Sequence, residues 1–205
     1  MNKSPAILRL FFVSIIILIT LLGPAEANLG KNARLVYLHG AWVWTSLTTF
    51  IASGLVGMIG FVVFWLDRKV IIFHQWSRAL SRTGLLFWIT YLPVSLWAME
   101  TNWNGLFLAE PRWRLAIIFA VAGFLLQLGL SLVPVAWSSF FNPAYILTLF
   151  LFIRQTETVM HPINPLQSEA ALRIQLFFGV LTILLIVASW QLASWFKSHE
   201  DKVIV

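Results

Sequence analysis

Two histidines with aromatic neighbours are the side chains of this sequence whose types and spacing suggest chemistry. His39 lies between Tyr37 and Trp42 at the start of a long apolar run, and His161 lies in a polar stretch between two later apolar runs. Imidazole is a common axial ligand of haem iron, and arginine pairs with carboxylates such as the propionates of a porphyrin. These residue types predict a non-covalent, b-type haem site with His39 and His161 as the candidate iron ligands.

Four further residues complete the predicted site. Trp42 and Trp103 would supply flat rings beside the porphyrin, Glu110 would orient a ligand or its partner, and Arg112 would pair with a propionate. Each also has a simpler interpretation, because tryptophans form belts at membrane interfaces and an exposed acid pairs with a nearby arginine at little energetic gain. A histidine at headgroup level can equally be satisfied by water or a backbone carbonyl.

The sequence offers no arrangement that predicts catalysis. It contains no glycine-rich phosphate loop, no recognisable nucleophile triad and no mid-span acid suited to a proton relay. It also contains no cysteine, which excludes disulfides and a covalent C-x-x-C-H haem attachment in this chain. We therefore expect a protein that is not an enzyme.

The composition predicts that the helices carrying these residues lie in a lipid bilayer. Of the 205 residues 60% are hydrophobic and 11% are charged, whereas soluble domains average about 45–50% and about 25%. We therefore expect an all-α, polytopic integral membrane bundle in contact with lipids. The net charge of +6 indicates cytoplasmic loops near anionic lipid rather than binding to nucleic acid.

Apolar segments of roughly 20 residues predict about six membrane spans. They form one membrane domain over residues 1–205, with spans near residues 7–22, 41–66, 85–99, 115–133, 137–153 and 174–196. The first segment also fits a cleavable signal peptide. Gly54, Gly57 and Gly60 would let another helix approach closely. The connector Asp67–Gly84 predicts a basic amphipathic helix lying on the membrane surface.

Arginine and lysine placement predicts the orientation. The connector carries Arg68, Lys69, Arg78 and Arg82 against one acid, so we place it and both termini in the cytoplasm of a bacterial cell. The candidate site residues would then gather at the outer face of the plasma membrane. His74 and His199 would lie inside, exposed to solvent.

The stretch from Arg34 to His39, Arg-Leu-Val-Tyr-Leu-His, with Trp42 and Trp44 after it, resembles the haem-handling proteins of cytochrome c assembly, the haem exporter protein C type. That family has six spans, an outer-face histidine ligand in this motif and a tryptophan-rich outer loop ending in an acid. The stretch from Trp103 to Arg112 keeps the opening Trp, a Gly, the acid Glu110 and the Arg, but Leu106, Phe107 and Ala109 replace tryptophans.

The resemblance implies a protein that holds haem at the outer membrane face and works with other membrane proteins in a complex. His39 would match the family's first histidine ligand, and His161 is the candidate for the second. The alternative is a structural or accessory subunit that kept the fold and lost haem, docking through its glycine face and surface helix. A small-molecule transporter is disfavoured by the lack of polar residues at mid-membrane and of internal repeats.

Overall fold

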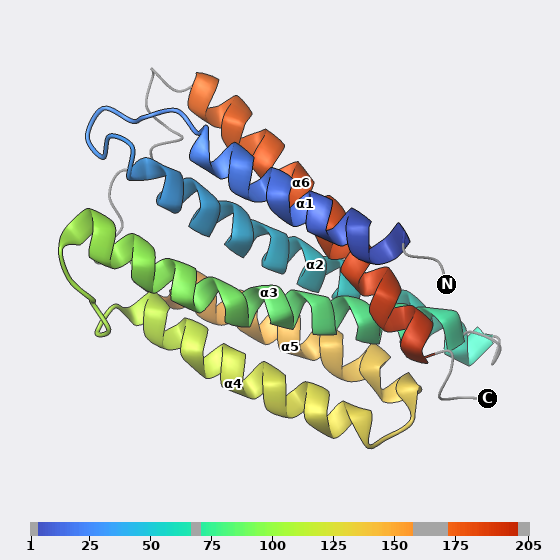
Figure 1. Cartoon of the computed structure of the whole chain (residues 1–205). Coiled ribbons are helices and arrows are strands. Elements are labelled where there is room, and N and C mark those ends of the chain that lie inside the picture. Colours follow the sequence, from blue (N-terminus) through green and yellow to red (C-terminus); the bar gives the residue numbers. More distant parts are fainter. Residues whose placement is uncertain (1–3, 67–70, 158–171, 201–205) are drawn as a thin grey trace.

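The computed structural model describes residues 4–66, 71–157 and 172–200, and this part of the chain is almost entirely helical (Figure 1). The described residues contain no strand apart from an isolated bridge between Glu26 and Gly30. The all-α prediction is therefore confirmed. In chain order the elements are α1 Ser4–Leu21, α2 Ala33–Leu66, α3 Ile71–Trp103, α4 Pro111–Ser131, the short 3-10 helix η1 Val135–Trp137, α5 Ser138–Gln155 and α6 Leu172–Glu200.

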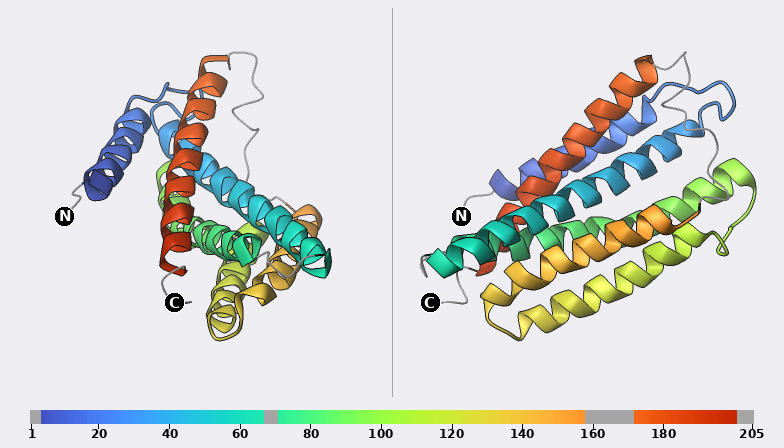
Figure 2. Two further views of the ribbon diagram at one scale, coloured as in Figure 1. Left: turned by 90° about the vertical axis from the view of Figure 1, so that its right-hand side faces the viewer. Right: turned by 180° about the vertical axis from the view of Figure 1, so that it is seen from behind.

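The helices run up and down beside one another, with α2 and α3 as the central pair (Figures 1 and 2). On one side of this pair lie α5 and α4, and on the other lie α6 and α1. The beginning of α1 leans away from the rest of the bundle (Figure 2). The ends of α1, α3 and α5 and the beginnings of α2, α4 and α6 share one end of the bundle, which we call the loop end. The opposite end, where α2 ends and α3 begins, is the terminal end, because both chain termini lie there.

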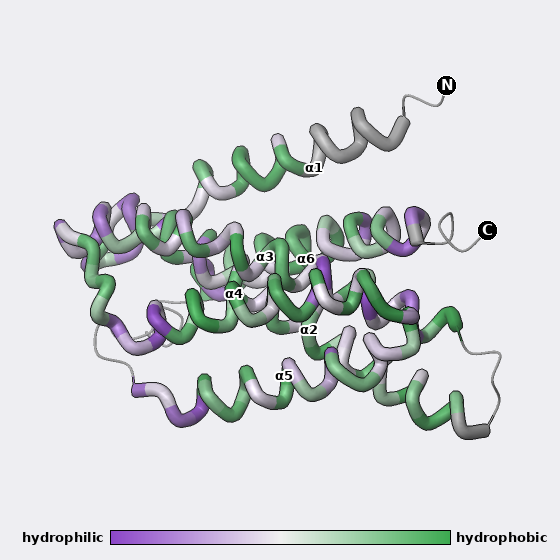
Figure 3. Tube along the Cα trace, turned by 90° about the horizontal axis from the view of Figure 1, so that it is seen from below, coloured by the Kyte–Doolittle hydropathy of each residue, from purple (hydrophilic) through white to green (hydrophobic). Residues whose placement is uncertain are grey.

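Four described helical segments are long and apolar enough to cross a membrane: Ala33–Phe64, Pro111–Ser131, Val135–Gln155 and Leu172–His199. Large apolar side chains are exposed along them, and hydrophobic residues dominate most of the length of α4 and α5 (Figure 3). Exposed apolar surface of this kind is stable when the solvent is hydrocarbon. The chain is therefore an integral membrane protein that contacts lipid. The polar residues of its first turns make α3 the least apolar of the helices.

Several tryptophans lie toward the two ends of the bundle. Trp76 stacks on Trp190 with ring centroids 4.8 Å apart at the terminal end, and Trp137 is exposed at that end as well. Trp97 is exposed near the loop end, and Trp44 is exposed further along α2, close to the level where Ser46 bonds to the carbonyl of Gly84. The helical rise from Trp76 to Trp97 is about 31 Å, close to the roughly 30 Å thickness of a hydrocarbon core. Such rings prefer the headgroup level, which suits the Trp76–Trp190 pair and Trp97.

The predicted surface helix in the Asp67–Gly84 connector is wrong for the residues that the structure describes. Residues 71–84 form the first turns of α3, a single helix that continues to Trp103. Arg78 and Leu80 are buried, and Trp76 packs against α6 rather than lying on a membrane surface. Ile71 and Ile72 are exposed, but most residues from His74 to Gly84 are buried, because this part of α3 packs against α2, α5 and α6.

The other predicted spans fall on observed helices whose ends differ from the predicted ones, and four helical segments have the length and composition to cross a membrane. The span predicted at 41–66 begins at Ala33 in α2, and the spans predicted at 115–133 and 174–196 correspond to α4 and α6. The turn between α4 and α5 occurs at Pro134, whereas Pro143 lies inside α5. A proline within a membrane helix is tolerated where neighbouring helices satisfy the freed backbone group.

The glycines of α2 allow the closest helix contacts of the bundle. A Cβ on Gly57 would lie 2.9 Å from Ser77 Oγ and 3.2 Å from the ring of Pro143. A Cβ on Gly60 would lie 2.9 Å from Ser139 Oγ. The predicted close approach is therefore confirmed, and the approaching helices are α3 and α5 of the same chain. This face is already covered, so docking of an accessory subunit through it is not available.

Replacing Gly57 by alanine should destabilise the bundle, since the added methyl group meets Ser77 and Pro143 at less than contact distance. We expect a loss of about 1–3 kcal/mol in the free energy of unfolding, typical of overpacking. Gly179→Ala is the matched control, because nothing lies within 4 Å of a Cβ there. Thermal unfolding of the purified variants in mild detergent measures both. Equal stability of the two variants would contradict the packing described.

Candidate functional site

His39 lies in the second turn of α2, near the loop end, and faces α3. Its side chain is partly buried, and its ring meets Tyr91 edge-on with centroids 5.6 Å apart. The ring atom Nδ1 is buried. Tyr91 also packs edge-on against Trp88, at 5.1 Å. The imidazole therefore lies at the edge of an aromatic cluster between α2 and α3.

Trp42 lies one turn further along α2 and fixes this helix to α3. Its indole Nε1 donates a hydrogen bond of 2.9 Å to Thr90 Oγ1. Its ring also packs on Phe87, with centroids 5.2 Å apart. The indole is thus engaged in packing between helices next to His39. Trp42 thus fixes the part of α2 that carries His39 against α3. Because its ring already packs on Phe87, it does not offer an open surface for a flat ligand.

The remaining described candidates also lie at the loop end. Trp103 is the last residue of α3, and Glu110 and Arg112 flank the first residue of α4. Glu110 is buried, with 4% of its surface exposed, and Arg112 is exposed. The helix dipole favours a carboxylate at the N-terminus of a helix, although the Glu110 side chain does not cap the N–H groups of α4. Glu110 is therefore not the exposed surface acid of the simpler interpretation.

His161, the second predicted ligand, lies outside the described residues. The helices on either side of its connection are described: α5 ends at Gln155 and α6 begins at Leu172, both at the loop end (Figure 1). The end of α5 and the beginning of α6 therefore lie at the same end of the bundle as His39, Trp103 and Glu110. Among the described residues, no three His, Cys, Asp or Glu side chains are grouped so that they could hold a metal ion.

A second set of polar side chains, missed from the sequence, lies inside the bundle near the terminal end. His74 is buried, with 5% of its surface exposed, and its Nδ1 lies 2.6 Å from Ser139 Oγ. The prediction of a solvent-exposed His74 is therefore wrong, because α2 and α5 close over this part of α3. One turn later, Arg78 Nε donates to Ser138 Oγ at 2.8 Å, and its Nη2 donates to the carbonyl of Val133 at 3.1 Å.

This buried polar network continues across four helices. Asn142 Nδ2 donates to the carbonyl and to Oγ of Ser77, both at 3.1 Å. Gln127 Nε2 donates to Asn142 Oδ1 at 3.0 Å and to Ser81 Oγ at 2.9 Å. Ser53 Oγ on α2 donates to the carbonyl of Ser77 at 2.7 Å. The sequence predicted no polar residues at mid-membrane, and this network lies nearer the terminal end, since Gln127 is close to the end of α4 and Asn142 is in the second turn of α5.

The network joins helices by hydrogen bonds. Arg78 connects α3 to the turn between α4 and α5, while Asn142 and Gln127 connect α5, α4 and α3. In hydrocarbon an unpaired amide costs several kcal/mol, so these side chains favour one arrangement of the helices. The sequence carried a signal for it, since single polar residues such as Ser53, Gln127 and Asn142 interrupt otherwise apolar runs.

Asn142→Ala should lower the stability of the bundle, because it removes the bonds to Ser77 and leaves Gln127 without its acceptor on α5. We expect a loss of about 1–3 kcal/mol in the free energy of unfolding. Thr148→Ala is the control, since the Thr148 hydroxyl is exposed and bonds only within its own helix; it should change stability by less than about 0.5 kcal/mol. Thermal unfolding in detergent compares the two, and equal losses would contradict a structural role for the network.

Comparison of the chain with known protein families, with curated proteins and with solved structures finds no match. The resemblance carried by Tyr37, His39 and the stretch from Trp103 to Arg112 therefore stays a prediction from the sequence.

Proposed function

We propose that this chain is a six-span protein of the bacterial plasma membrane that holds haem reversibly at its loop end. His39 would be one axial ligand of the iron, and His161 the candidate for the other. When bound, the haem would supply an iron centre that accepts an imidazole nitrogen. The protein's part is to bind and orient the group, and no bond is made or broken by the chain.

The position of His39 carries this proposal. Among the described residues it is the one histidine at the loop end, and its side chain is partly exposed beside the ring of Tyr91. The other two described histidines lie at the terminal end, where His74 bonds to Ser139 and His199 to the carbonyl of Trp195. Because Nδ1 of His39 is buried, Nε2 is the nitrogen that we assign to the iron.

The neighbouring residues fit supporting roles. Trp42 would position His39 by fixing α2 against Thr90 of α3. Arg112 is exposed at the start of α4 and would pair with a propionate, where a guanidinium forms charge-assisted hydrogen bonds. Trp103, at the end of α3, would contact the porphyrin. Partners in this function would be other membrane proteins that deliver or receive haem.

The competing proposal is a non-catalytic accessory subunit that keeps the fold without haem. The observation that favours it is the engagement of Trp42 and His39 in the packing between α2 and α3. Such a subunit would have to dock through a surface other than the glycine face of α2, which α3 and α5 cover.

Haem titration separates the two proposals. The full chain, purified in mild detergent, should shift the Soret absorption of added haem, and His39→Ala should raise the dissociation constant by at least about tenfold, the loss of about 1.4 kcal/mol. His199→Ala is the matched control, because that histidine is exposed at the terminal end, and it should bind as the natural sequence does. No Soret shift with the natural sequence, or equal affinity in the folded His39→Ala variant, would support the accessory subunit instead.

The proposed orientation has its own test. The sequence contains no cysteine, so single cysteines can be labelled without background. Ala27→Cys lies in the exposed connection at the loop end, and Ser198→Cys lies near the end of α6. A membrane-impermeant maleimide added to intact cells should label Cys at position 27 and leave position 198 unmodified. The reverse pattern would place the loop end in the cytoplasm and would rule out haem held at the outer face.

A further inference from the structure

The contact between His39 and Tyr91 restricts the plane of the imidazole ring. The two rings meet edge-on, with centroids 5.6 Å apart and planes at 66° to each other. Aromatic pairs favour this arrangement, because the edge of a ring carries positive and its face negative partial charge. An imidazole that tilted away from this plane would lose the contact. The position of Tyr91 therefore bears on how His39 presents its ring nitrogens.

The register of α2 against α3 places Tyr91 beside His39. The two helices run in opposite directions, and residues three or four apart on a helix share a face. Trp42 packs on Phe87, and one turn away along both helices His39 packs on Tyr91. The hydrogen bond from Trp42 to Thr90 joins the helices at the same level. A shift of α3 along α2 would break both ring pairs together.

The ring of Tyr91 is itself held by its surroundings. Its side chain is 6% exposed, and it packs edge-on against Trp88 with centroids 5.1 Å apart. Trp88 is buried as well, and its Nε1 donates a hydrogen bond of 3.0 Å to the carbonyl of Ala116 on α4. A functional side chain keeps its orientation when the groups around it are locked by packing and hydrogen bonds. Tyr91 meets this condition, since α3 and α4 both fix it.

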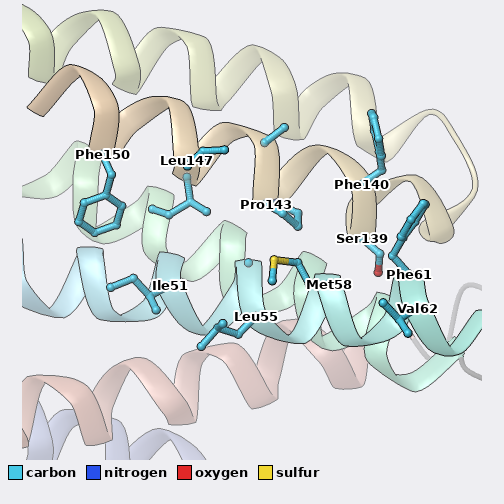
Figure 4. Close-up of a pocket in the computed structure, with 13 residues that line it drawn as sticks. Ile51, Leu55, Met58, Phe61, Val62, Ser139, Phe140, Pro143, Leu147 and Phe150 are labelled. Atoms are coloured by element: carbon cyan, nitrogen blue, oxygen red, sulfur yellow. The ribbon is translucent and has the colours of Figure 1, made fainter.

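His39 lies apart from the apolar groove between α2 and α5. This groove has a volume of about 700 Å³ and is lined on α2 by residues between Ile51 and Val62 (Figure 4). The helical rise from His39 to Ile51 is about 18 Å. Of the described residues that line the groove, Ser139 alone is polar, and its hydroxyl is bonded to His74. Tyr91 does not line it, so a substitution there changes the ring contact and leaves the groove as it is.

We propose that Tyr91 is the positioning residue of the His39 imidazole, with Trp88 holding the Tyr91 ring in place. The identity of the ligand rests on the haem site proposed above, whereas the position of the imidazole is a property of the chain alone. In metal sites the groups that orient a ligating histidine strongly affect the affinity for the metal. Tyr91 would act through its ring, and its hydroxyl would not be required.

Nuclear magnetic resonance of the full chain with ¹³C-labelled histidine, in mild detergent and without haem, tests the position of the ring. The order parameter of the His39 ring C–H bond should be about 0.85, as in a rigid group, and should fall below about 0.6 in Tyr91→Leu. Leucine fills much of the space but lacks the ring. Tyr91→Phe keeps the ring and should keep the rigid value. His39→Ala identifies the signal among those of the four histidines.

Phe119→Leu is the matched control. Phe119 is buried in the same apolar cluster as Tyr91, and it pairs with Tyr145 and Phe152. This variant should leave the His39 order parameter unchanged, and size-exclusion chromatography should show all variants folded. An imidazole that is equally ordered in the natural sequence and in Tyr91→Leu would overturn the proposal. An equal loss of order in Phe119→Leu would also overturn it, because the effect would then come from a general loosening of the cluster.

Haem titration of the same variants tests the role of Tyr91 at the proposed site. Tyr91→Leu should raise the dissociation constant about three- to tenfold, the range that corresponds to the energy of an edge-to-face ring pair, and Tyr91→Phe should bind as the natural sequence does. Equal haem affinity in Tyr91→Leu would overturn this role. An imidazole ordered by Tyr91 in a chain that binds no haem would refute the haem function and support the positioning of His39 by itself.

Discussion

Hydrogen bonding without water is the constraint on which the interior of this bundle depends. In hydrocarbon every polar group that leaves the aqueous phase has to find its partner on the protein. Asn142 and Ser77 meet this requirement between α5 and α3, and Arg78 does so against the turn that follows α4. The amide nitrogen of Gln127 bonds to Asn142 and Ser81, whereas its buried oxygen has no hydrogen-bond partner. A helix that moved relative to its neighbours would break several of these bonds at once. The network therefore selects one arrangement among helices whose apolar faces alone would pack in many ways.

Close backbone approach makes this network possible. Gly57 and Gly60 bring α2 within contact distance of Ser77, Pro143 and Ser139. Short distances between helix axes bring short side chains such as serine within hydrogen-bonding reach of a neighbouring backbone, as in the bond from Ser53 to the carbonyl of Ser77. The close packing of the helices at the terminal end and the hydrogen bonds between them therefore depend on each other.

The two ends of the bundle differ in character. At the terminal end the polar side chains of α3 turn inward and bond to α5. At the loop end aromatic rings dominate the contact of α2 with α3: Trp42 with Phe87, and His39 with Tyr91. The partly exposed imidazole and the exposed arginine of α4 lie beside connections between helices, where a ligand can approach without disturbing the network. The haem site that we propose would therefore lie at the end of the bundle away from the hydrogen-bond network.

Composition and segment length alone predicted an integral membrane protein, because a soluble fold of this size could not bury a chain in which 60% of the residues are hydrophobic. Hydrophobicity also located the helices, and the spacing of Gly54, Gly57 and Gly60 predicted a close contact. Only the tertiary structure decided which helices make that contact, and that His74 and Arg78 lie inside the bundle rather than on a surface. Helical periodicity shows that two residues share a face, but the partner of that face is set by packing with helices distant in sequence. For the same reason the burial of Glu110 and the engagement of Trp42 with Thr90 could not be predicted from the residues around them.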